Sequence, residues 1–430
     1  MSTPISVAPA GRGLRGRLAI PSDKSIAHRA LLFGAIARGT TAIHGFQGGR
    51  DNRATMAAAR ALGVTIDEAG ETLRVHGGGF EGLRAPTAAI DCENSGTTMR
   101  LLTGVLAGRP FPTRLVGDAS LLRRPMRRVI EPLGRMGAAI TSEPGDGRAP
   151  LRIDGRALHA AEHTLAVASA QVKSAILLAG LQATGRTRVA EPVRSRDHTE
   201  RMLRDFGVTL EGEERWVAID GPQALHATTI TLPGDFSSAA FLMVAATVIP
   251  GSELTLTNVG LNPTRTGLLD ALTAMGAAVE VIPEGDGAEP VGSIVIRHRP
   301  LRAIRIAGDL LVRSIDEFPI LCVAAACAEG TTEIRDAAEL RVKESDRIAV
   351  MAEFLRDLGV VVEELPDGLV ITGPARLAGA RVDPRGDHRI AMAAAVAGLA
   401  GTAPVTIDDP ECAEVSFPGF YRTLAAAAGA

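Results

Sequence analysis

The sequence predicts an α/β protein with two domains, and three observations support this fold class. A pattern of short apolar strands and alanine- and leucine-rich helical segments recurs six times along the 430 residues. Hydrophobic residues make up 46% of the chain and charged residues 22%, which is typical of globular proteins and excludes disordered and fibrous classes. The length suggests about two to four domains and is sufficient to bury large cores.

Each repeat starts with a short apolar strand, followed by a polar cluster and a first helix. These helical segments begin near Ser25, Ser95, Ser169, Phe236, Asp316 and Asp387. We expect a glycine to end each of them, because glycine directly after a helix is a common C-terminal signal. The six glycines, which follow one another at intervals of 66 to 79 residues, are Gly39, Gly108, Gly185, Gly251, Gly330 and Gly401.

After each of the first five glycines we expect a second strand and a second helix that ends at another glycine. Two alternating apolar runs around a turn then follow, as in VVVEELPDGLVITG after Gly359, and this pattern is typical of a hairpin. The repeat is therefore β-α-β-α-β-β, with three repeats in each domain. The glycines that end the second helices are Gly63, Gly137, Gly207, Gly276 and Gly359.

The sixth repeat stops after its second helix and has no hairpin, whereas the chain begins with a spare strand, ISVAP. We infer that this first strand completes the last repeat, which puts both termini in one domain. The predicted domains are 1–14 plus 231–430, and an inserted domain over 15–230. The alternative is two sequential domains that divide near residue 230.

Polar clusters occupy the starts of the six first helices. Helix capping by Ser, Asp and Asn accounts for any one cluster. Capping does not require the added cations Lys24, Arg29, Arg100 and Arg389. A helix N-terminus with free N–H groups and a nearby cation suits phosphate and carboxylate. We therefore expect the active site in the cleft between the domains, with small, multiply anionic ligands. The clusters span 21–25, 93–98, 169–171, 234–238, 316–317 and 387–389.

Three further cation-rich stretches lie on the second helices or before them. Residues 123–128 contain four arginines, and a solvated basic face is the alternative there. Residues 194–201 alternate in charge, which also suits i,i+4 pairing on an exposed helix. In 341–347, Lys343 and Arg347 are four residues apart, so we expect them to share a helical face, as ligand-binding groups or within a salt-bridge lattice.

Composition also restricts the partners. The net charge of −3 and the 3% aromatic content argue against binding of nucleic acid or of a membrane surface. The sequence has no HExxH, Cys/His quartet, GxSxG or dinucleotide fingerprint, so we expect neither a metal nor a cofactor. The N-terminus has no apolar leader segment, and the four cysteines suit a reducing compartment, which predicts a cytoplasmic protein.

The polar clusters together resemble a known family. They are Pro-Ser-Asp-Lys-Ser at 21–25 with His28 and Arg29, Asn-Ser-Gly-Thr-Thr-Met-Arg at 94–100, 117–118 and 124–126, Ser-Ala-Gln at 169–171, Ser-Arg-Asp-His-Thr at 195–199, Asp-Glu at 316–317, Arg-Val-Lys-Glu-Ser-Asp-Arg at 341–347 and Asp-His-Arg at 387–389. In this order, over nearly the whole chain, they resemble the 3-phosphoshikimate 1-carboxyvinyltransferases, or 5-enolpyruvylshikimate-3-phosphate synthases.

The resemblance implies an enolpyruvyl-transferase-like fold of two lobes, each with three β-α-β-α-β-β units, and both termini in one lobe. It also implies a transferase that moves the enolpyruvyl group of phosphoenolpyruvate to the 5-hydroxyl of shikimate 3-phosphate and releases phosphate. This reaction belongs to the shikimate pathway, which leads to chorismate and the aromatic amino acids. Such an enzyme binds only small-molecule substrates, and we expect it to be a monomer.

The resemblance also assigns roles to individual residues. Asp316 would accept the proton of the attacking hydroxyl, Glu344 would handle the proton at the phosphoenolpyruvate methylene, and Lys24 would contact both substrates. The residues implied for shikimate 3-phosphate are Lys24, Ser25, Arg29, Ser169, Ala170, Gln171, Arg196, Asp316 and Lys343. Those implied for phosphoenolpyruvate are Lys24, Gly96, Arg124, Gln171, Arg347 and Arg389. For Gly96, a tight turn without ligand contact is the alternative.

Three positions depart from the commonest family pattern. Glu93 stands where glycine often precedes the Asn-Ser-Gly motif, and Ala170 replaces a serine that some members carry. Val415 stands where many members have a lysine, which removes one expected phosphoenolpyruvate contact. A related transferase that acts on UDP-N-acetylglucosamine uses a loop cysteine, for which Cys92 and Cys412 are the candidates here. A catalytically inactive anion-binding module on the same scaffold is the remaining alternative.

Overall fold

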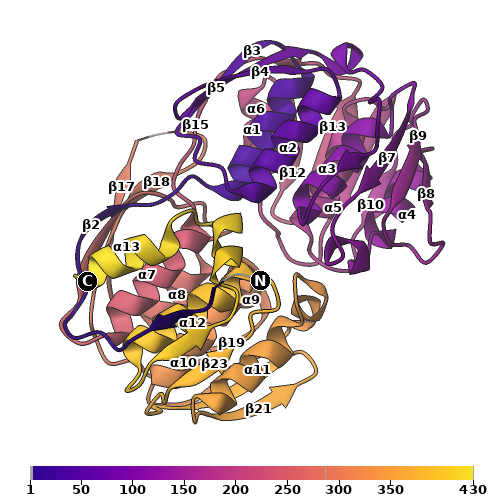
Figure 1. Ribbon diagram of the computed structural model, residues 1–430. Coiled ribbons are helices and arrows are strands. Elements are labelled where there is room, and N and C mark those ends of the chain that lie inside the picture. The colour runs from indigo at the N-terminus through magenta and orange to yellow at the C-terminus, as the bar shows by residue number, and fades with distance from the viewer. Residues whose placement is uncertain (1–2, 286, 430) are drawn as a thin grey trace. The chain divides into compact units, whose positions relative to one another are not determined.

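The computed structural model describes residues 3–285 and 287–429 and divides the chain into two units (Figure 1). Unit 2 runs from Ser22 to Leu232, and unit 1 takes the chain up to Pro21 and again from Pro233 onward. Each unit has its own hydrophobic core, and no core residue of one belongs to the cluster of the other among the described residues. Each unit therefore buries its apolar residues as a separate domain would.

Unit 2 contains three mixed sheets. In each, one or two short strands pair in parallel with the second strand of a repeat, and the hairpin continues the sheet in antiparallel fashion. In order across each sheet, the strands are β14 (Leu225–His226) and β15 (Thr229–Thr231), β3 (Ala37–His44), β5 (Thr72–Gly78), β4 (Thr65–Ala69); β6 (Ile90–Asp91), β7 (Pro112–Val116), β9 (Leu151–Asp154), β8 (Ala139–Ser142); and β10 (Glu162–Thr164), β11 (Gly185–Ala190), β13 (Trp216–Gly221), β12 (Glu211–Glu213).

The described part of unit 1 has three sheets of the same design. The sixth repeat lacks its own hairpin, and its sheet ends with the N-terminal strand of the chain. In order across each sheet, the strands are β2 (Arg15–Ala19), β16 (Glu253–Gly260), β18 (Val291–Arg297), β17 (Ala278–Glu284); β19 (Arg305–Ile306), β20 (Gly330–Ile334), β22 (Gly368–Gly373), β21 (Val361–Leu365); and β23 (Ala380–Val382), β24 (Val405–Ile407), β1 (Ile5–Val7).

The inference about the first strand is confirmed. β1 pairs antiparallel with β24, and the register places Ile5 opposite Ile407 and Val7 opposite Val405. The N-terminal strand thus takes the place that a hairpin strand occupies in the other repeats. Both ends of the chain consequently belong to unit 1.

Two strands do not stay with the repeat that follows them in the sequence. β2 precedes the first repeat but pairs with β16 of the fourth, and β15 precedes the fourth but pairs with β3 of the first. The chain crosses between the units directly after each of these strands, so each completes a sheet in the unit that the chain is leaving. The predicted boundary near residue 14 is therefore too early, because β2 belongs to unit 1, and the crossings follow Pro21 and Leu232.

Helices pack beside these sheets, and in each unit three nearly fully buried helices lie at the centre (Figure 1). The central helices are α1 (Lys24–Ile36), α3 (Gly96–Leu106) and α5 (Ala170–Gly180) in unit 2, and α7 (Phe236–Val248), α10 (Phe318–Cys327) and α12 (His388–Ala400) in unit 1. The remaining helices are α2 (Arg50–Ala61), α4 (Arg127–Arg135), α6 (His198–Asp205), α8 (Gly267–Ala274), α9 (Gly308–Arg313), α11 (Arg347–Asp357) and α13 (Phe420–Ala428). Among the described residues, no helix is both long enough and apolar enough to cross a bilayer.

The predicted ends of the second helices are confirmed at all five glycines. Each of these glycines has a φ between 84° and 93°, the left-handed region that residues with a Cβ rarely adopt. After α2, Gly63 N donates to Arg60 O at 2.9 Å and Val64 N donates to Ala59 O at 3.1 Å. This bond pair defines a Schellman motif, and the same pair recurs after α4, α6, α8 and α11.

Three of the six glycines assigned to the ends of the first helices have a different role, whereas Gly401 is the C-cap of α12, as predicted. Gly39, Gly185 and Gly330 lie in or at the start of the second strand, and each faces a glycine of the hairpin across the sheet. The prediction that they end the helices is wrong, since α1, α5 and α10 stop earlier, at Ile36, Gly180 and Cys327. The positive φ of these three glycines, between 101° and 111°, explains why the sequence needs glycine there.

Small residues let the central helices approach each other closely. A Cβ added to Gly104 of α3 would lie 2.3 Å from the carbonyl oxygen of Ala175 in α5 and 2.8 Å from its Cα. Backbone atoms cannot move away as a side-chain end can. The contact between α3 and α5 therefore depends on a glycine at this position.

The variant Gly104→Ala should destabilise unit 2 by roughly 1–3 kcal/mol, the usual cost of overpacking a dense core. Thermal unfolding followed by circular dichroism measures this effect as a lower Tm. Gly134→Ala is the matched control, because Gly134 also lies inside a helix but has open space around its Cβ position. We expect the control to be neutral or slightly stabilising. Equal Tm values for the two variants would contradict the close approach.

Candidate active site

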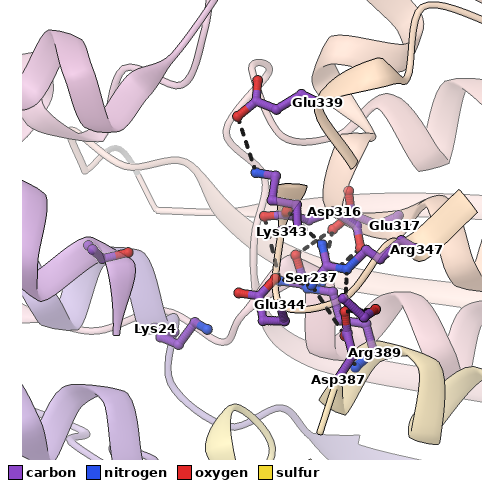
Figure 2. Close-up of polar contacts among 12 residues, drawn as sticks. Lys24, Ser237, Asp316, Glu317, Glu339, Lys343, Glu344, Arg347, Asp387 and Arg389 are labelled. Atoms are coloured by element: carbon purple, nitrogen blue, oxygen red, sulfur yellow. Dashed lines mark hydrogen bonds and ion pairs between the residues drawn. The ribbon is translucent and has the colours of Figure 1, made fainter. Parts of the chain in front are cut away.

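A buried guanidinium organises a polar cluster in unit 1 (Figure 2). Arg347 is the first residue of α11 and is 1% exposed. Its Nε donates to Asp387 Oδ2 at 2.8 Å, and its Nη2 donates to Glu344 Oε2 at 2.8 Å. Burial alone would lower the pKa of Arg347, but the surrounding carboxylates, Asp387 foremost, outweigh burial and raise that pKa. The guanidinium therefore stays charged.

Asp316 lies between two cations of this cluster. It belongs to η3 (Ile315–Glu317), directly before α10. Its Oδ1 is 3.6 Å from Arg347 Nη1, and its Oδ2 is 3.6 Å from Arg389 Nη2. Arg389 Nη1 also donates to the main-chain oxygen of Asp316 at 3.1 Å. The Asp316 side chain is 13% exposed, so it is held by two arginines and is still partly accessible.

Glu317, the next residue, is fully buried and links the starts of the three central helices of unit 1. It accepts a hydrogen bond from Ser237 Oγ in the first turn of α7. Its Oε1 lies 4.0 Å from Nη1 of Arg389, which is in the first turn of α12. Arg265 Nη2 donates to Ser237 Oγ at 2.6 Å from the loop before α8. The starts of α7, α10 and α12 therefore meet at one polar cluster.

Lys343 and Glu344 lie in the segment between η4 (Ala338–Val342) and α11. The expectation that Lys343 and Arg347 share a helical face is wrong, because Asp346 caps α11 and the helix begins only at Arg347. Lys343 Nζ instead lies 3.6 Å from Glu339 Oε1, with a quarter of its side chain exposed. The Glu344 side chain is 17% exposed and remains beside Arg347.

In unit 2, two guanidinium groups lie over the start of α3. A Cβ added to Gly96 would lie 2.7 Å from Arg100 Nη1 and 3.2 Å from Arg124 Nη1. Gly96 is the first residue of the helix and has no positive φ, so the tight-turn interpretation does not hold. Arg124 Nη2 donates to Asn94 Oδ1 at 2.6 Å, which holds this guanidinium beside the helix start.

The starts of α3 and α5 are joined through Gln171. Arg100 Nη1 donates to Gln171 Oε1, and Gln171 Nε2 donates to Thr97 Oγ1 at 2.9 Å. Ser169 precedes α5 in an extended conformation, with φ −149° and ψ 101°, and its side chain does not cap the helix. The caps of α1 and α3, Asp23 and Ser95, do accept from first-turn N–H groups. The start of α5 therefore lacks the side-chain cap that its neighbours have.

Lys24 and Arg29 belong to α1. Lys24 Nζ lies 3.0 Å from Asp51 Oδ2, and both side chains are largely buried. Arg29 is 3% exposed and connects α1 with α5 and α6: Nη2 donates to Ser174 Oγ at 2.9 Å, and Nε donates to Thr199 Oγ1 at 2.7 Å. Arg29 Nη1 donates to the main-chain oxygen of Ser25, a half-buried residue of the first turn.

Arg196 lies in the loop between β11 and α6 and is half-buried. The predicted pairing of its charged neighbours is present. Asp197 accepts from Arg194 at 2.8 Å and from Arg201, four residues on, at 2.9 Å.

Sequence reasoning missed the residues that hold these side chains in place. Asp387 appeared only as part of a helix start, yet it is the main acceptor for Arg347. Asp51 and Ser174 gave no signal, and Thr199 appeared only within a motif, because each contacts its cation from another helix. The need of a buried arginine for a carboxylate could have indicated Asp387, but no spacing rule predicts the others.

Comparison with known proteins agrees with the motifs. The family model for EPSP synthase (3-phosphoshikimate 1-carboxyvinyltransferase) matches residues 9–424. A 3-phosphoshikimate 1-carboxyvinyltransferase of Geobacter metallireducens is 53% identical over 420 residues, which are 97% of this chain and 98% of that protein. One from Halorhodospira halophila is 55% identical over 97% of this chain and 94% of its own. An EPSP synthase structure from Acinetobacter baumannii is 44% identical with a TM-score of 0.87, covering 99% and 98% of the two chains.

This chain belongs to the EPSP synthase family. It is a transferase that moves the enolpyruvyl group of phosphoenolpyruvate to shikimate 3-phosphate in aromatic biosynthesis. The enolpyruvyl transferase NikO of Streptomyces tendae, 21% identical with a TM-score of 0.79, shares the fold. The predicted fold of two lobes with three repeats each is therefore confirmed.

The two candidate cysteines of this EPSP synthase family member are not suited to act as a loop nucleophile. Cys92 and Cys412 are both buried, and burial is the main cause that raises the pKa of each thiol well above its usual value. Cys412 Sγ also donates to the main-chain oxygen of Asp409 at 2.9 Å. Neither thiol is poised to form a thiolate. Among the described residues, no group of three or more His, Cys, Asp or Glu side chains is arranged to hold a metal ion.

The variant Asp387→Asn should destabilise unit 1 by roughly 3 kcal/mol, because it removes the main countercharge of a buried guanidinium. Asparagine is also a good N-cap, so the capping bond to Arg389 N at 3.0 Å is retained. Thermal unfolding measures the loss. Asp346→Asn is the control: Asp346 caps α11 in the same way but is a third exposed and pairs with Arg341 near the surface. If both variants lowered Tm equally, the buried ion pair would not be the cause.

Proposed function

We propose that the two polar clusters act together on the substrates of the EPSP synthase reaction. The residues implied for phosphoenolpyruvate and for shikimate 3-phosphate come from both units, and in each unit they gather at the starts of the three central helices. Together the substrates carry several negative charges. Two sets of helix N-termini with arginine and lysine side chains suit such ligands.

In unit 2, the start of α5 is the proposed subsite for the phosphate of shikimate 3-phosphate. Ser169 does not cap this helix, so its hydroxyl and the first N–H groups can bind the phosphate oxygens. Ala170 contributes through its backbone and Gln171 through its side chain. Lys24, Ser25, Arg29 and Arg196 complete this part of the site in the proposal. Contacts with other helices hold Lys24 and Arg29 in position.

Phosphoenolpyruvate is assigned to Gly96 and Arg124 in unit 2 and to Arg347 and Arg389 in unit 1, with Lys24 and Gln171 also in contact. Arg347 Nη1 supports this proposal, because no described residue accepts a hydrogen bond from this buried nitrogen. A carboxylate or phosphate oxygen of the substrate would supply the acceptor. The absence of a Cβ on Gly96 lets an anionic group approach the start of α3 beside two guanidinium groups.

Asp316 carries the chemistry in this proposal. Its carboxylate lies between Arg347 and Arg389, and the side chain is partly exposed. It takes the proton from the 5-hydroxyl of shikimate 3-phosphate as the hydroxyl oxygen bonds to the central carbon of phosphoenolpyruvate. Glu344 delivers a proton to the methylene carbon of phosphoenolpyruvate, which becomes a methyl group. When phosphate leaves, Glu344 takes one proton back from this methyl group and the double bond re-forms. Lys343 and the arginines stabilise the charge of the tetrahedral intermediate.

We also propose that the protein acts as a monomer in the cytoplasm. All residues named for both substrates belong to one chain, so no second copy is needed to complete the site. The four cysteines are unpaired, which suits a reducing compartment.

The variant Asp316→Asn tests the assigned base. It keeps the size of the side chain but cannot accept the hydroxyl proton, so kcat should fall by about 10²-fold or more. Phosphate release in the presence of both substrates measures this rate. Asp309→Asn is the control, an exposed carboxylate of the same unit whose variant should retain full activity. A near-normal kcat in Asp316→Asn would remove Asp316 from the chemistry.

The variant Gly96→Ala tests the assigned phosphoenolpyruvate subsite. The new methyl would displace Arg100 or Arg124, whose flexible ends can move without unfolding the helix. We expect KM for phosphoenolpyruvate to rise about tenfold, a loss of about 1.4 kcal/mol, and by a larger factor than KM for shikimate 3-phosphate. Tm should change little. An equal rise in both KM values, or a change in Tm alone, would count against the assignment.

A further inference from the structure

One buried carboxylate joins two separate segments that the proposed function assigns to shikimate 3-phosphate. Glu191 directly follows β11, and its side chain is 3% exposed. Its Oε1 accepts from Ser195 Oγ at 2.6 Å and from the main-chain N–H of Ser169 at 3.2 Å. Its Oε2 accepts from Lys173 Nζ at 2.8 Å and from the main-chain N–H of Ser195 at 3.3 Å. Four donors therefore converge on one side chain.

Lys173 fixes the orientation of this carboxylate. Its side chain is 4% exposed, and Nζ lies between Glu191 Oε2 at 2.8 Å and Glu200 Oε1 at 2.7 Å. Burial alone would lower the pKa of Lys173, but the two carboxylates outweigh burial and raise that pKa. The ammonium thus stays charged, and its attraction holds Oε2 on the lysine side. Oε1 is then directed at Ser169 and Ser195.

The bond to Ser169 has a consequence for the start of α5. The main-chain N–H of Ser169 is tied to Glu191 while the residue is extended and its hydroxyl does not cap the helix. A serine before a helix ordinarily prefers to cap it. Holding the backbone in this conformation keeps both the hydroxyl and the first-turn N–H groups of α5 open to a ligand. The second segment that Glu191 holds, at Ser195, directly precedes Arg196.

We infer that Glu191 is a positioning residue for shikimate 3-phosphate, acting through Ser169 and through the Ser195–Arg196 segment, with Lys173 as the group that orients it. The inference rests on the proposed roles of Ser169 and Arg196. Glu191 touches neither substrate in this arrangement. It fixes the distance between two segments that bind the same ligand, and this preorganisation lowers the cost of ordering them upon binding.

The test compares two isosteric variants, Glu191→Gln and Glu200→Gln. Each removes one negative charge from Lys173 and leaves it one carboxylate partner. Among the described residues, Glu200 makes no hydrogen bond to Ser169 or Ser195, so it matches Glu191 in burial and charge but not in position. In Glu191→Gln, the Lys173 ammonium can only donate a hydrogen bond, so the amide oxygen turns toward it. The amide NH₂ then faces Ser169 N–H, which loses its acceptor.

For Glu191→Gln we expect KM for shikimate 3-phosphate to rise tenfold or more, with KM for phosphoenolpyruvate and kcat within about threefold of the wild type. Calorimetric titration with shikimate 3-phosphate alone should show the same loss of affinity. Glu200→Gln should keep both KM values within about twofold. Ser195→Ala, which removes one of the four bonds and no charge, should raise KM for shikimate 3-phosphate by an intermediate factor.

Several outcomes would overturn the inference. If Glu191→Gln and Glu200→Gln changed KM for shikimate 3-phosphate equally, the cause would be the lost charge. If Glu191→Gln raised both KM values equally, or changed only Tm, Glu191 would have a structural role. If Glu191→Gln does not fold, an unchanged KM for shikimate 3-phosphate in Ser195→Ala refutes the inference. The wild type in the same assay separates these cases from failure of the proposed function, because that failure would appear as no phosphate release with the two substrates.

Discussion

The close packing of three small-residue helices at the centre of each unit determines where everything else lies. In unit 2, Gly104 meets the backbone of Ala175, and a single added methyl would collide with it. Where two helices approach this closely, only a residue without a side chain fits at the contact, as Gly104 does. Because the three helices start at the same end, their N-termini and polar first turns gather there. The site is a consequence of this packing.

The clustered helix starts bring several positive charges close together, and both units compensate these charges with nearby carboxylate or amide groups. Several buried or half-buried cations lie close together, and three of them have a carboxylate or amide partner: Asp387 for Arg347, Asp51 for Lys24 and Asn94 for Arg124. Removing such a partner would leave a buried charge less well compensated. The partners therefore stabilise the fold and also hold the cations in place before any ligand arrives. Glu191 extends this principle to a loop and a helix start.

The sequence predicted some features of the repeat at the level of single residues and missed others. The glycines after the second helices end them through identical Schellman motifs, because the left-handed conformation requires glycine wherever the motif occurs. In the first set, Gly39, Gly185 and Gly330 looked equivalent but belong to a strand, since a positive φ is needed there too. Glycine spacing identifies positions of unusual φ and does not distinguish a helix end from a strand start.

The sequence by itself determined the six repeats, the closing role of the N-terminal strand, the family and the segments that carry the candidate site residues, because each depends on local patterns along the chain. Only the tertiary structure decided that β2 and β15 exchange between repeats, since strand pairing depends on where the chain crosses between units. The same holds for Arg347 with Asp387, for Arg29 with Ser174 and for Glu191 with Ser169. These partners are up to 145 residues apart, and only the folded helices bring them within hydrogen-bond distance.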